Sequence, residues 1–356
     1  MSHSPLCLTP LELPANSRGK ILNKNLSRVI AAAMTLLASS AAISSCGSTF
    51  CAANTNWDTQ GLSNAEGLRI NMRYVYTKAN KLRAGASKIT ANAPSGSDEE
   101  IEDKRTINQV LHFDTDYAIN SRWNIALSAP LIMRDHTHTF DSSVSDPFTQ
   151  QSTFTSLGDV RVVGKYKFDT DSLLSGSGIH FGLKLPSGAI NKIMTPPDPS
   201  NPDTPYALER SAQPGTGSTD AILGIYYFRN LPGKDWGWFA SGQIQSAIAT
   251  RKQYRPGQAL TLDVGAHYDI TPTLNGLLQI NALYRQRDSG INANLASGGH
   301  TVSLSPGLSY ALTPKTQVYG LLQIALRQYT NTNPNDPASG QLTAPWSLAL
   351  GVGHRF

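Results

Sequence analysis

The last eleven residues of the chain alternate between large, mostly apolar side chains and small or polar ones. Trp346, Leu348, Leu350 and Val352 share one parity, which ends on the terminal Phe356, and the positions of the other parity hold only Ser, Ala, Gly and Arg. Successive side chains of a β-strand point to opposite faces. The segment therefore predicts a strand with one apolar face and one small or polar face, and this strand closes the chain.

The same alternation recurs from about residue 67 onward, between segments rich in turn-forming residues. Counting the terminal segment, twelve strands are predicted, and an even number suits a closed single-chain barrel. The other eleven fall at 68–76, 111–119, 123–131, 160–168, 179–185, 219–229, 235–248, 260–268, 274–284, 302–312 and 318–326.

The connections between these segments alternate in length. Short turns are expected near 120–121, 169–177, 230–234, 271–272 and 313–314. The connections between them, near 78–106, 134–156, 188–217, 249–258, 287–300 and 328–343, are longer and rich in Asp, Asn, Pro, Ser and Gly. Such alternation is typical of a barrel with short periplasmic turns and long extracellular loops, with both chain ends on the periplasmic side.

The predicted fold class is therefore all-β, a twelve-stranded antiparallel transmembrane barrel of the outer-membrane type over residues 67–356. Aromatic residues near strand ends suit a membrane interface. Charged residues make up only 15% of the chain, and no run of eighteen apolar residues would supply a helical anchor. The aromatic residues near strand ends are Trp123, Trp236, Trp238, Tyr268, Tyr284, Tyr310 and Trp346. The alternative to a barrel is a soluble two-sheet sandwich with one solvent-exposed face.

Residues 1–53 predict an export signal with a short N-terminal extension, followed by a periplasmic segment at 54–66. Lys20, Lys24 and Arg28 precede an apolar stretch and then small residues, the pattern of a signal peptide. Cleavage after Ala53 is one expectation; the other is a lipoprotein-type cleavage with Cys46 lipidated. The leader carries four basic residues and one acid, so its removal takes the net charge from +5 to +2 and leaves little reason to expect nucleic-acid binding.

All three cysteines lie in or beside the leader, which leaves none in the predicted barrel. An exported barrel without disulfides fits this distribution. Cys46 and Cys51 could pair or bind a metal if retained, but no nearby His completes a zinc-type spacing. We expect no metal and no cofactor.

Several motifs resemble a family of bacterial outer-membrane proteins grouped under the MetA pathway of phenol degradation, or simply as transporters. These are Ser156–Tyr166, Gly182–Gly188, Gln213–Asp220, Ser305–Leu308 and the closing aromatic. The likeness runs from about residue 46 to the end. It implies a barrel that moves small, aromatic molecules. Members carry a denser cysteine cluster after the leader, so any role of that cluster does not transfer, and no catalytic residue does either.

The inward parity of the predicted strands gathers more cations than acids. A surplus of one charge raises the local concentration of oppositely charged solutes, which predicts a pore that favours anionic or polar solutes. The alternative is a closed barrel in which these cations pair with Asp114, Asp116, Asp263 and Asp269 and with interior glutamines. The candidate solute-path residues are Arg69, Arg73, Arg161, Lys165, Lys167, Lys184, Arg285 and Arg327.

Other motifs carry less chemistry. His136 and His138 beside Asp135 could bind a cation, but the sequence favours two solvent-exposed loop histidines. Gly215–Ser218 lacks the Lys of a P-loop, and a turn into a strand explains it better. An outer-membrane lipid hydrolase would need a Ser and a His together at the outer boundary, whereas the lipid-facing His354 lies at the periplasmic end.

The leading prediction is an outer-membrane channel that passes small, aromatic or anionic solutes by passive diffusion and is not an enzyme. A non-conducting structural or adhesive barrel is the main alternative, and a lipid hydrolase is the third. The expected partners are outer-membrane lipid, small solutes and the barrel-assembly machinery, with Phe356 as the assembly signal. The sequence leaves open the substrate, the oligomeric state and whether the lumen is open.

Overall fold

The structure is a computed structural model that describes residues 60, 67–89, 100–140, 148–168, 174–197, 202–203, 205–335 and 340–356. Among these residues, no helix has the length and apolar character needed to cross a membrane. The short 3-10 turn η1 (Arg210–Ala212) lies in the connection between β8 and β9. The predicted leader, Cys46, Cys51 and, except for Gln60, the predicted periplasmic segment lie outside the described residues.

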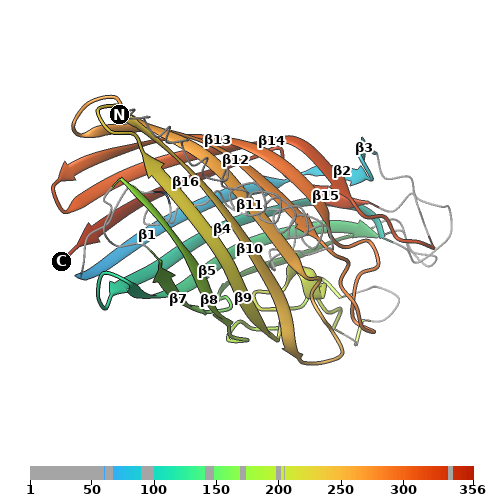
Figure 1. Cartoon of the computed structure of the whole chain (residues 1–356). Coiled ribbons are helices and arrows are strands. Elements are labelled where there is room, and N and C mark those ends of the chain that lie inside the picture. Colours follow the sequence, from blue (N-terminus) through green and yellow to red (C-terminus); the bar gives the residue numbers. More distant parts are fainter. Residues whose placement is uncertain are drawn as a thin grey trace, which may run out of the picture. The chain divides into compact units, whose positions relative to one another are not determined.

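Twelve antiparallel strands form a closed barrel, which confirms the predicted fold class (Figure 1). The first strand closes the ring by pairing with the last strand on one side and with β4 on the other, because β4 also pairs with β5. In ring order the strands are β1 (Gly67–Ala79), β4 (Glu100–Ala118), β5 (Trp123–Phe140), β7 (Arg161–Lys167), β8 (Ser175–Lys184), β9 (Ser218–Asn230), β10 (Trp236–Thr250), β11 (Ala259–Asp269), β12 (Leu274–Arg285), β13 (Gly299–Thr313), β14 (Thr316–Thr330) and β16 (Trp346–Arg355).

A bulge divides one wall strand into two pieces. Strand β6 (Phe148–Leu157) and β7 both pair with β5. Ser128 pairs with Arg161 and Leu131 pairs with Leu157, so two residues of β5 face three residues of the other strand. An extra residue of this kind reverses which side chains face inward. Inward positions are therefore even-numbered in β6 and odd-numbered in β7.

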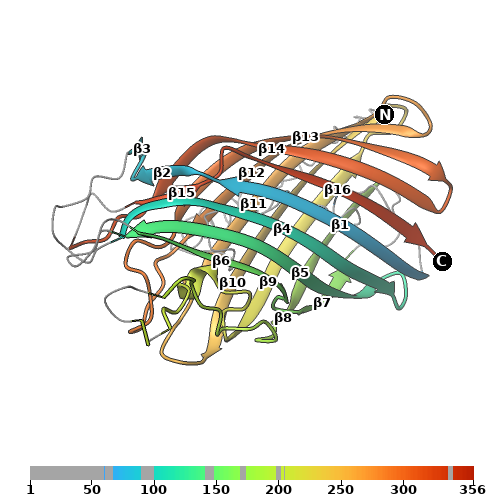
Figure 2. The same ribbon diagram turned by 180° about the vertical axis from the view of Figure 1, so that it is seen from behind.

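Short turns gather at one end of the barrel, here called the turn end, at 119–122, 168–174, 231–235, 270–273 and 314–315. The opposite end, here called the loop end, carries the longer connections. Two of the predicted loops are too long. Strand β1 reaches 79 and β4 begins at 100, within the predicted loop at 78–106, and β5 and β6 extend into the predicted loop at 134–156. Figure 2 shows a small sheet at the loop end, made of β2 (Lys81–Ala84), β3 (Ser87–Lys88) and β15 (Gln341–Thr343).

The outer face of the barrel is apolar. Leu68, Ile70 and Met72 on β1 point outward and are each more than one-third exposed, whereas the residues between them face inward. The predicted interfacial aromatics are exposed on this face. Trp123, Trp236, Trp238, Tyr268 and Tyr310 lie near the turn end, and Tyr284 and Trp346 near the loop end. A water-exposed surface this rich in apolar side chains would be unfavourable, whereas lipid accepts it.

Candidate functional site

The interior of the barrel is the candidate site, and the strand register decides which side chains reach it. Residues paired across neighbouring strands share a face, so Arg69 lies on the same face as its partners Asp116 and Arg355. The register places seven of the eight predicted lumen-lining residues on the inward face, namely Arg69, Arg73, Arg161, Lys165, Lys167, Lys184 and Arg285.

The prediction for Arg327 is wrong, because this side chain lies on the outer face. Between the pairs Val302–Arg327 and Ser303–Ala325 one extra residue, Leu326, forms a bulge in β14. The bulge reverses the alternation beyond it. Arg327 therefore pairs with the outward Val302 and is exposed.

A charged wall runs along the interior faces of β1, β4, β5 and β7. The Lys165 ammonium lies 2.6 Å from an Asp116 carboxylate oxygen, and the Arg73 guanidinium lies 3.8 Å from Asp114. Asn71 also donates to Asp114 at 3.2 Å. Two cations of this wall, Arg73 and Lys165, thus pair with acids, as the satisfied-network alternative requires.

Lys167 differs from Lys165 on the same strand. Its ammonium lies 5.8 Å from the centroid of the Phe228 ring, within reach of a cation–π interaction. Among the described residues, no carboxylate lies at salt-bridge distance from Lys167. Lys167 is therefore a lumen cation whose charge is not neutralised by a described acid.

A second ionic cluster is buried beside the bulge between β6 and β7. The Lys184 ammonium lies 3.0 Å from both Asp159 and Asp220, and all three side chains are at most 5% exposed. Asp159 accepts hydrogen bonds from the Thr216 amide at 2.9 Å and from the Gly188 amide at 3.1 Å. The cluster thus attaches both ends of the 185–217 connection to the barrel wall.

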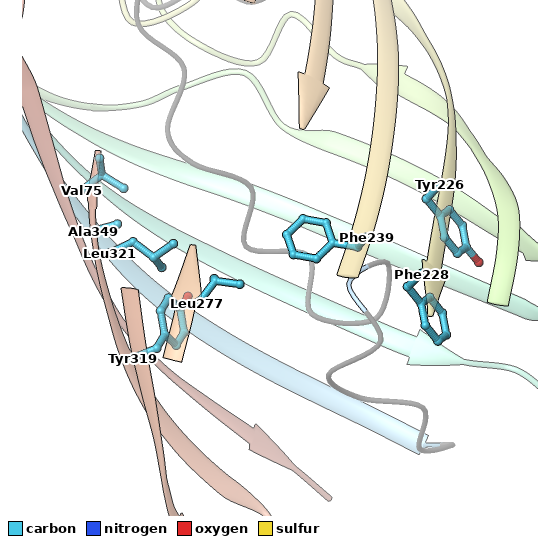
Figure 3. Packing of buried hydrophobic residues seen from close by; sticks show 8 residues of the cluster. All are labelled: Val75, Tyr226, Phe228, Phe239, Leu277, Tyr319, Leu321 and Ala349. Carbon is cyan, nitrogen blue, oxygen red and sulfur yellow. The ribbon is translucent and has the colours of Figure 1, made fainter. Parts of the chain in front are cut away.

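An apolar stripe occupies part of the interior faces of β9, β10, β12, β14 and β16 and ends on β1 (Figure 3). The same faces also carry buried polar residues, among them Gln245, Gln279 and Gln323. It passes through directly paired positions, including Val75 with Ala349 and Phe228 with Phe239. Glycine at 265 leaves room for the Phe239 ring, which a Cβ there would overlap. The stripe consists of Val75, Tyr226, Phe228, Phe239, Leu277, Tyr319, Leu321 and Ala349. The run from Ile222 to Phe228, apolar on both faces, is the sequence signal that could have revealed its aromatic part.

The connection 185–217 folds into the barrel instead of away from it. Its residues Met194, Leu208 and Ala212 pack against Ile132 of β5 and Phe154 of β6, both of which face inward. Arg134, also inward on β5, donates a hydrogen bond to the Ala212 carbonyl. This connection therefore narrows the interior at the loop end.

Its other side contacts neighbouring connections. The Arg210 guanidinium lies 5.0 Å from the centroid of the Tyr254 ring, and Asn294 donates to Glu209 at 2.8 Å. The Tyr254 hydroxyl in turn donates to Asp288 at 2.9 Å. Contacts on both sides hold the connection in place.

The interpretation of His136 and His138 as exposed loop residues is wrong. Both lie on β5, face inward and are at most 4% exposed, because β5 continues seven residues beyond Met133. The His136 ring hydrogen-bonds the Thr106 hydroxyl at 2.8 Å, and the two imidazole centroids lie 5.2 Å apart. Among the described residues, no group of three or more His, Cys, Asp or Glu side chains could hold a metal ion.

Two further candidates lie at the turn end. The His354 ring hydrogen-bonds the Thr316 hydroxyl at 2.8 Å and packs edge-on against Phe356, with ring centroids 4.7 Å apart. Phe356 is 62% exposed, and its amide donates to the Leu68 carbonyl at 3.0 Å. The final aromatic thus joins the outer face where the first and last strands meet.

Comparison with known proteins agrees with this architecture. Residues 203–340 match the family model described as "Putative MetA-pathway of phenol degradation". This match confirms the resemblance over those residues. No curated protein matches the chain.

An outer-membrane channel from Pseudomonas putida F1 shares the fold. It is 13% identical, with a TM-score of 0.58, over 83% of this chain and 97% of that one. The toluene transporter TbuX of Ralstonia pickettii is 11% identical, with a TM-score of 0.44, over 85% of this chain and 92% of that one. At such identities the likeness of the first structure establishes the fold alone. The chain has the fold of a bacterial outer-membrane channel.

Proposed function

We propose that this chain is a passive diffusion channel of the bacterial outer membrane for small solutes that are aromatic or anionic. The observation that carries the proposal is the two-sided interior. Charged residues of β1, β4, β5 and β7 gather on one part of the ring, and the apolar stripe lies among uncharged and charged polar side chains on the part from β9 round to β1. A solute with an aromatic body and a charged or polar group finds a matching surface on each side.

The fold and its surface support the localisation. The apolar outer face with aromatic residues at both ends suits lipid. The predicted leader supports export, with the turn end in the periplasm and the loop end outside. Phe356 is the proposed recognition element for the barrel-assembly machinery, because it is an exposed aromatic on the last strand. Lipidation of Cys46 remains the alternative to plain signal-peptide cleavage.

The pairing of the lumen cations refines the expected selectivity. Lys165, Lys184, Arg73 and Arg285 each lie beside a carboxylate, so their charges are largely offset locally. Lys167 has a ring as its neighbour instead. We therefore assign most of the anion preference within Arg161, Lys165 and Lys167 to Lys167.

Planar-bilayer recordings of the refolded barrel under a salt gradient test the proposal. We expect stable single-channel steps and a reversal potential that indicates anion preference. Lys167→Gln should shift that potential toward the non-selective value. The double variant Lys165→Gln with Asp116→Asn preserves net charge and should leave it unchanged.

The outcomes separate the alternatives. Single-channel current steps without ion preference would support the channel proposal but contradict the role assigned to Lys167. A folded, inserted barrel that stays silent in the bilayer would favour the non-conducting structural or adhesive barrel.

A further inference from the structure

Two cations lie on the outer face at the loop end among aromatic and polar side chains, where a third outward cation, Arg105, pairs with Asp135 at 2.7 Å. Arg327 is turned outward by the bulge at Leu326, which is itself 61% exposed. Lys78 lies on the outward parity of β1, paired with Ile107. Among the described residues, neither cation has a carboxylate at salt-bridge distance. A cation facing lipid without a partner is costly unless it reaches the headgroup region or an anion.

Aromatic residues place these cations at headgroup level. Tyr284 pairs with His300, and His300 pairs with Tyr329, so the three side chains share the outer face. The His300 and Tyr329 rings stack with centroids 4.9 Å apart and 4° between their planes. Tyrosine and tryptophan at strand ends prefer the interface between hydrocarbon and headgroups.

The two cations belong to one continuous surface. Thr77 pairs with Ser347, so Lys78 and Trp346 occupy neighbouring positions on β1 and β16, and Trp346 pairs with Ile324 of β14. Neighbouring strands lie about 4.8 Å apart, which puts β1 about 10 Å from β14. Arg327 lies three residues beyond Ile324, a further displacement of about 10 Å along β14, so the backbones at Lys78 and Arg327 are roughly 14 Å apart. Their long side chains can still contact the two ends of a single large headgroup. We define the rim patch as Lys78, Tyr284, His300, Arg327, Tyr329 and Trp346.

We propose that the rim patch binds the phosphorylated headgroup of a glycolipid in the outer leaflet. Arg327 supplies a planar guanidinium for bidentate contact with a phosphate, and Lys78 supplies a second positive charge. The tyrosine and tryptophan rings pack on the sugar and the upper acyl region. This inference requires the barrel to lie in a membrane but does not require it to conduct solutes.

Binding to vesicles tests the proposal with the full-length barrel. The barrel is inserted into phosphatidylcholine vesicles that also contain a bis-phosphorylated glycolipid. After detergent extraction, native mass spectrometry measures how much of the glycolipid stays bound to the barrel. The phosphate-free form of the same glycolipid serves as the comparison. We expect retention of the phosphorylated form only, weakened about fivefold by Lys78→Gln or Arg327→Gln and about twenty-five-fold by both.

Matched variants make the outcome decisive. Arg229→Gln removes an outward, exposed arginine at the turn end and should leave retention unchanged. Arg327→Lys should recover part of the loss, and heat-modifiable gel mobility reports folding of each variant. Equal retention of the two glycolipid forms, or full retention by the folded double variant, would overturn the proposal. Competition by inorganic phosphate alone would also overturn it, because the site would then bind the free anion.

Discussion

The Lys184 ammonium lies 3.0 Å from the Asp159 carboxylate, although Asp159 stands between β6 and β7 and belongs to neither strand. The bulge turns Asp159 inward, where its carboxylate also accepts a hydrogen bond from the Thr216 amide. Asp159 thereby joins the break in the wall both to β8, through Lys184, and to the connection that narrows the interior, through Thr216. The consequences for stability and for access to the lumen can be measured separately.

Replacing Lys184 by Met should destabilise the barrel strongly. The substitution leaves Asp159 and Asp220 buried without their cation, and removal of one partner from a buried pair costs about 3–5 kcal/mol. Urea-induced unfolding in lipid vesicles measures the loss in free energy of unfolding. Lys234→Met, in an exposed turn, should change it by less than about 0.5 kcal/mol. Equal stability of the two variants would show that the cluster adds nothing to the fold.

Replacing Met194 by Asp should release the 185–217 connection from the interior. Met194 is 1% exposed among Ile132, Phe154 and Leu208, and a buried unpaired carboxylate is unfavourable there. We expect faster proteolysis between 185 and 217 and larger single-channel conductance. Ile193→Asp places the same charge at a neighbouring position that is 46% exposed and should alter neither. Unchanged cleavage in Met194→Asp would contradict the packing described here.

Docking of the same connection should weaken as the pH falls. His136 packs edge-on against His138, whose ring contacts Tyr206 of the connection with centroids 6.2 Å apart. His136 lies on β5 beyond the apolar belt, since the next outward residues are Asp135 and Thr137, and so it stands outside the membrane-spanning part. Burial, then His138 and Arg134, lower the pKa of His136 from 6.5 to about 3. The released or unfolded chain takes up a proton below about pH 6.5, whereas the folded site does so only near pH 3.

The stabilising contribution of neutral His136 is therefore complete above pH 6.5 and is lost progressively as the pH falls toward 3. Between these pH values the free energy that favours the docked, folded state falls by at most about 1.4 kcal/mol per pH unit. Proteolysis of the 185–217 connection at a series of pH values measures this, with a protease whose own pH dependence is calibrated on an unfolded peptide. In His136→Gln the acid-induced increase should be smaller. An identical pH profile in both proteins would assign the effect to other groups.

Removing the terminal aromatic should impair assembly in cells more than folding in vitro. Phe356→Ala deletes an exposed ring but leaves the amide that donates to Leu68. We expect a several-fold lower yield of heat-modifiable barrel in the outer membrane and unchanged refolding into detergent. Phe168→Ala, which removes another outward aromatic at the turn end, serves as the control. A normal cellular yield of Phe356→Ala would remove the assembly role.

Much of the barrel is determined by the sequence alone, because strand alternation is a local property. The parity of Leu68, Ile70 and Met72 identifies the lipid-facing side of β1 without any knowledge of its neighbours. The turn positions and the total of twelve strands follow from the same pattern. Seven of the eight predicted lumen residues face inward for this reason.

Tertiary structure decided the rest, because it depends on which strands become neighbours. A bulge exists only relative to a partner strand, so the outward position of Arg327 and the inward position of Asp159 could not be read from spacing. The sequence likewise lists Lys165 and Lys167 as equivalent cations. Only the closed ring sets Asp116 beside the first and the Phe228 ring beside the second, which decides where uncompensated charge remains.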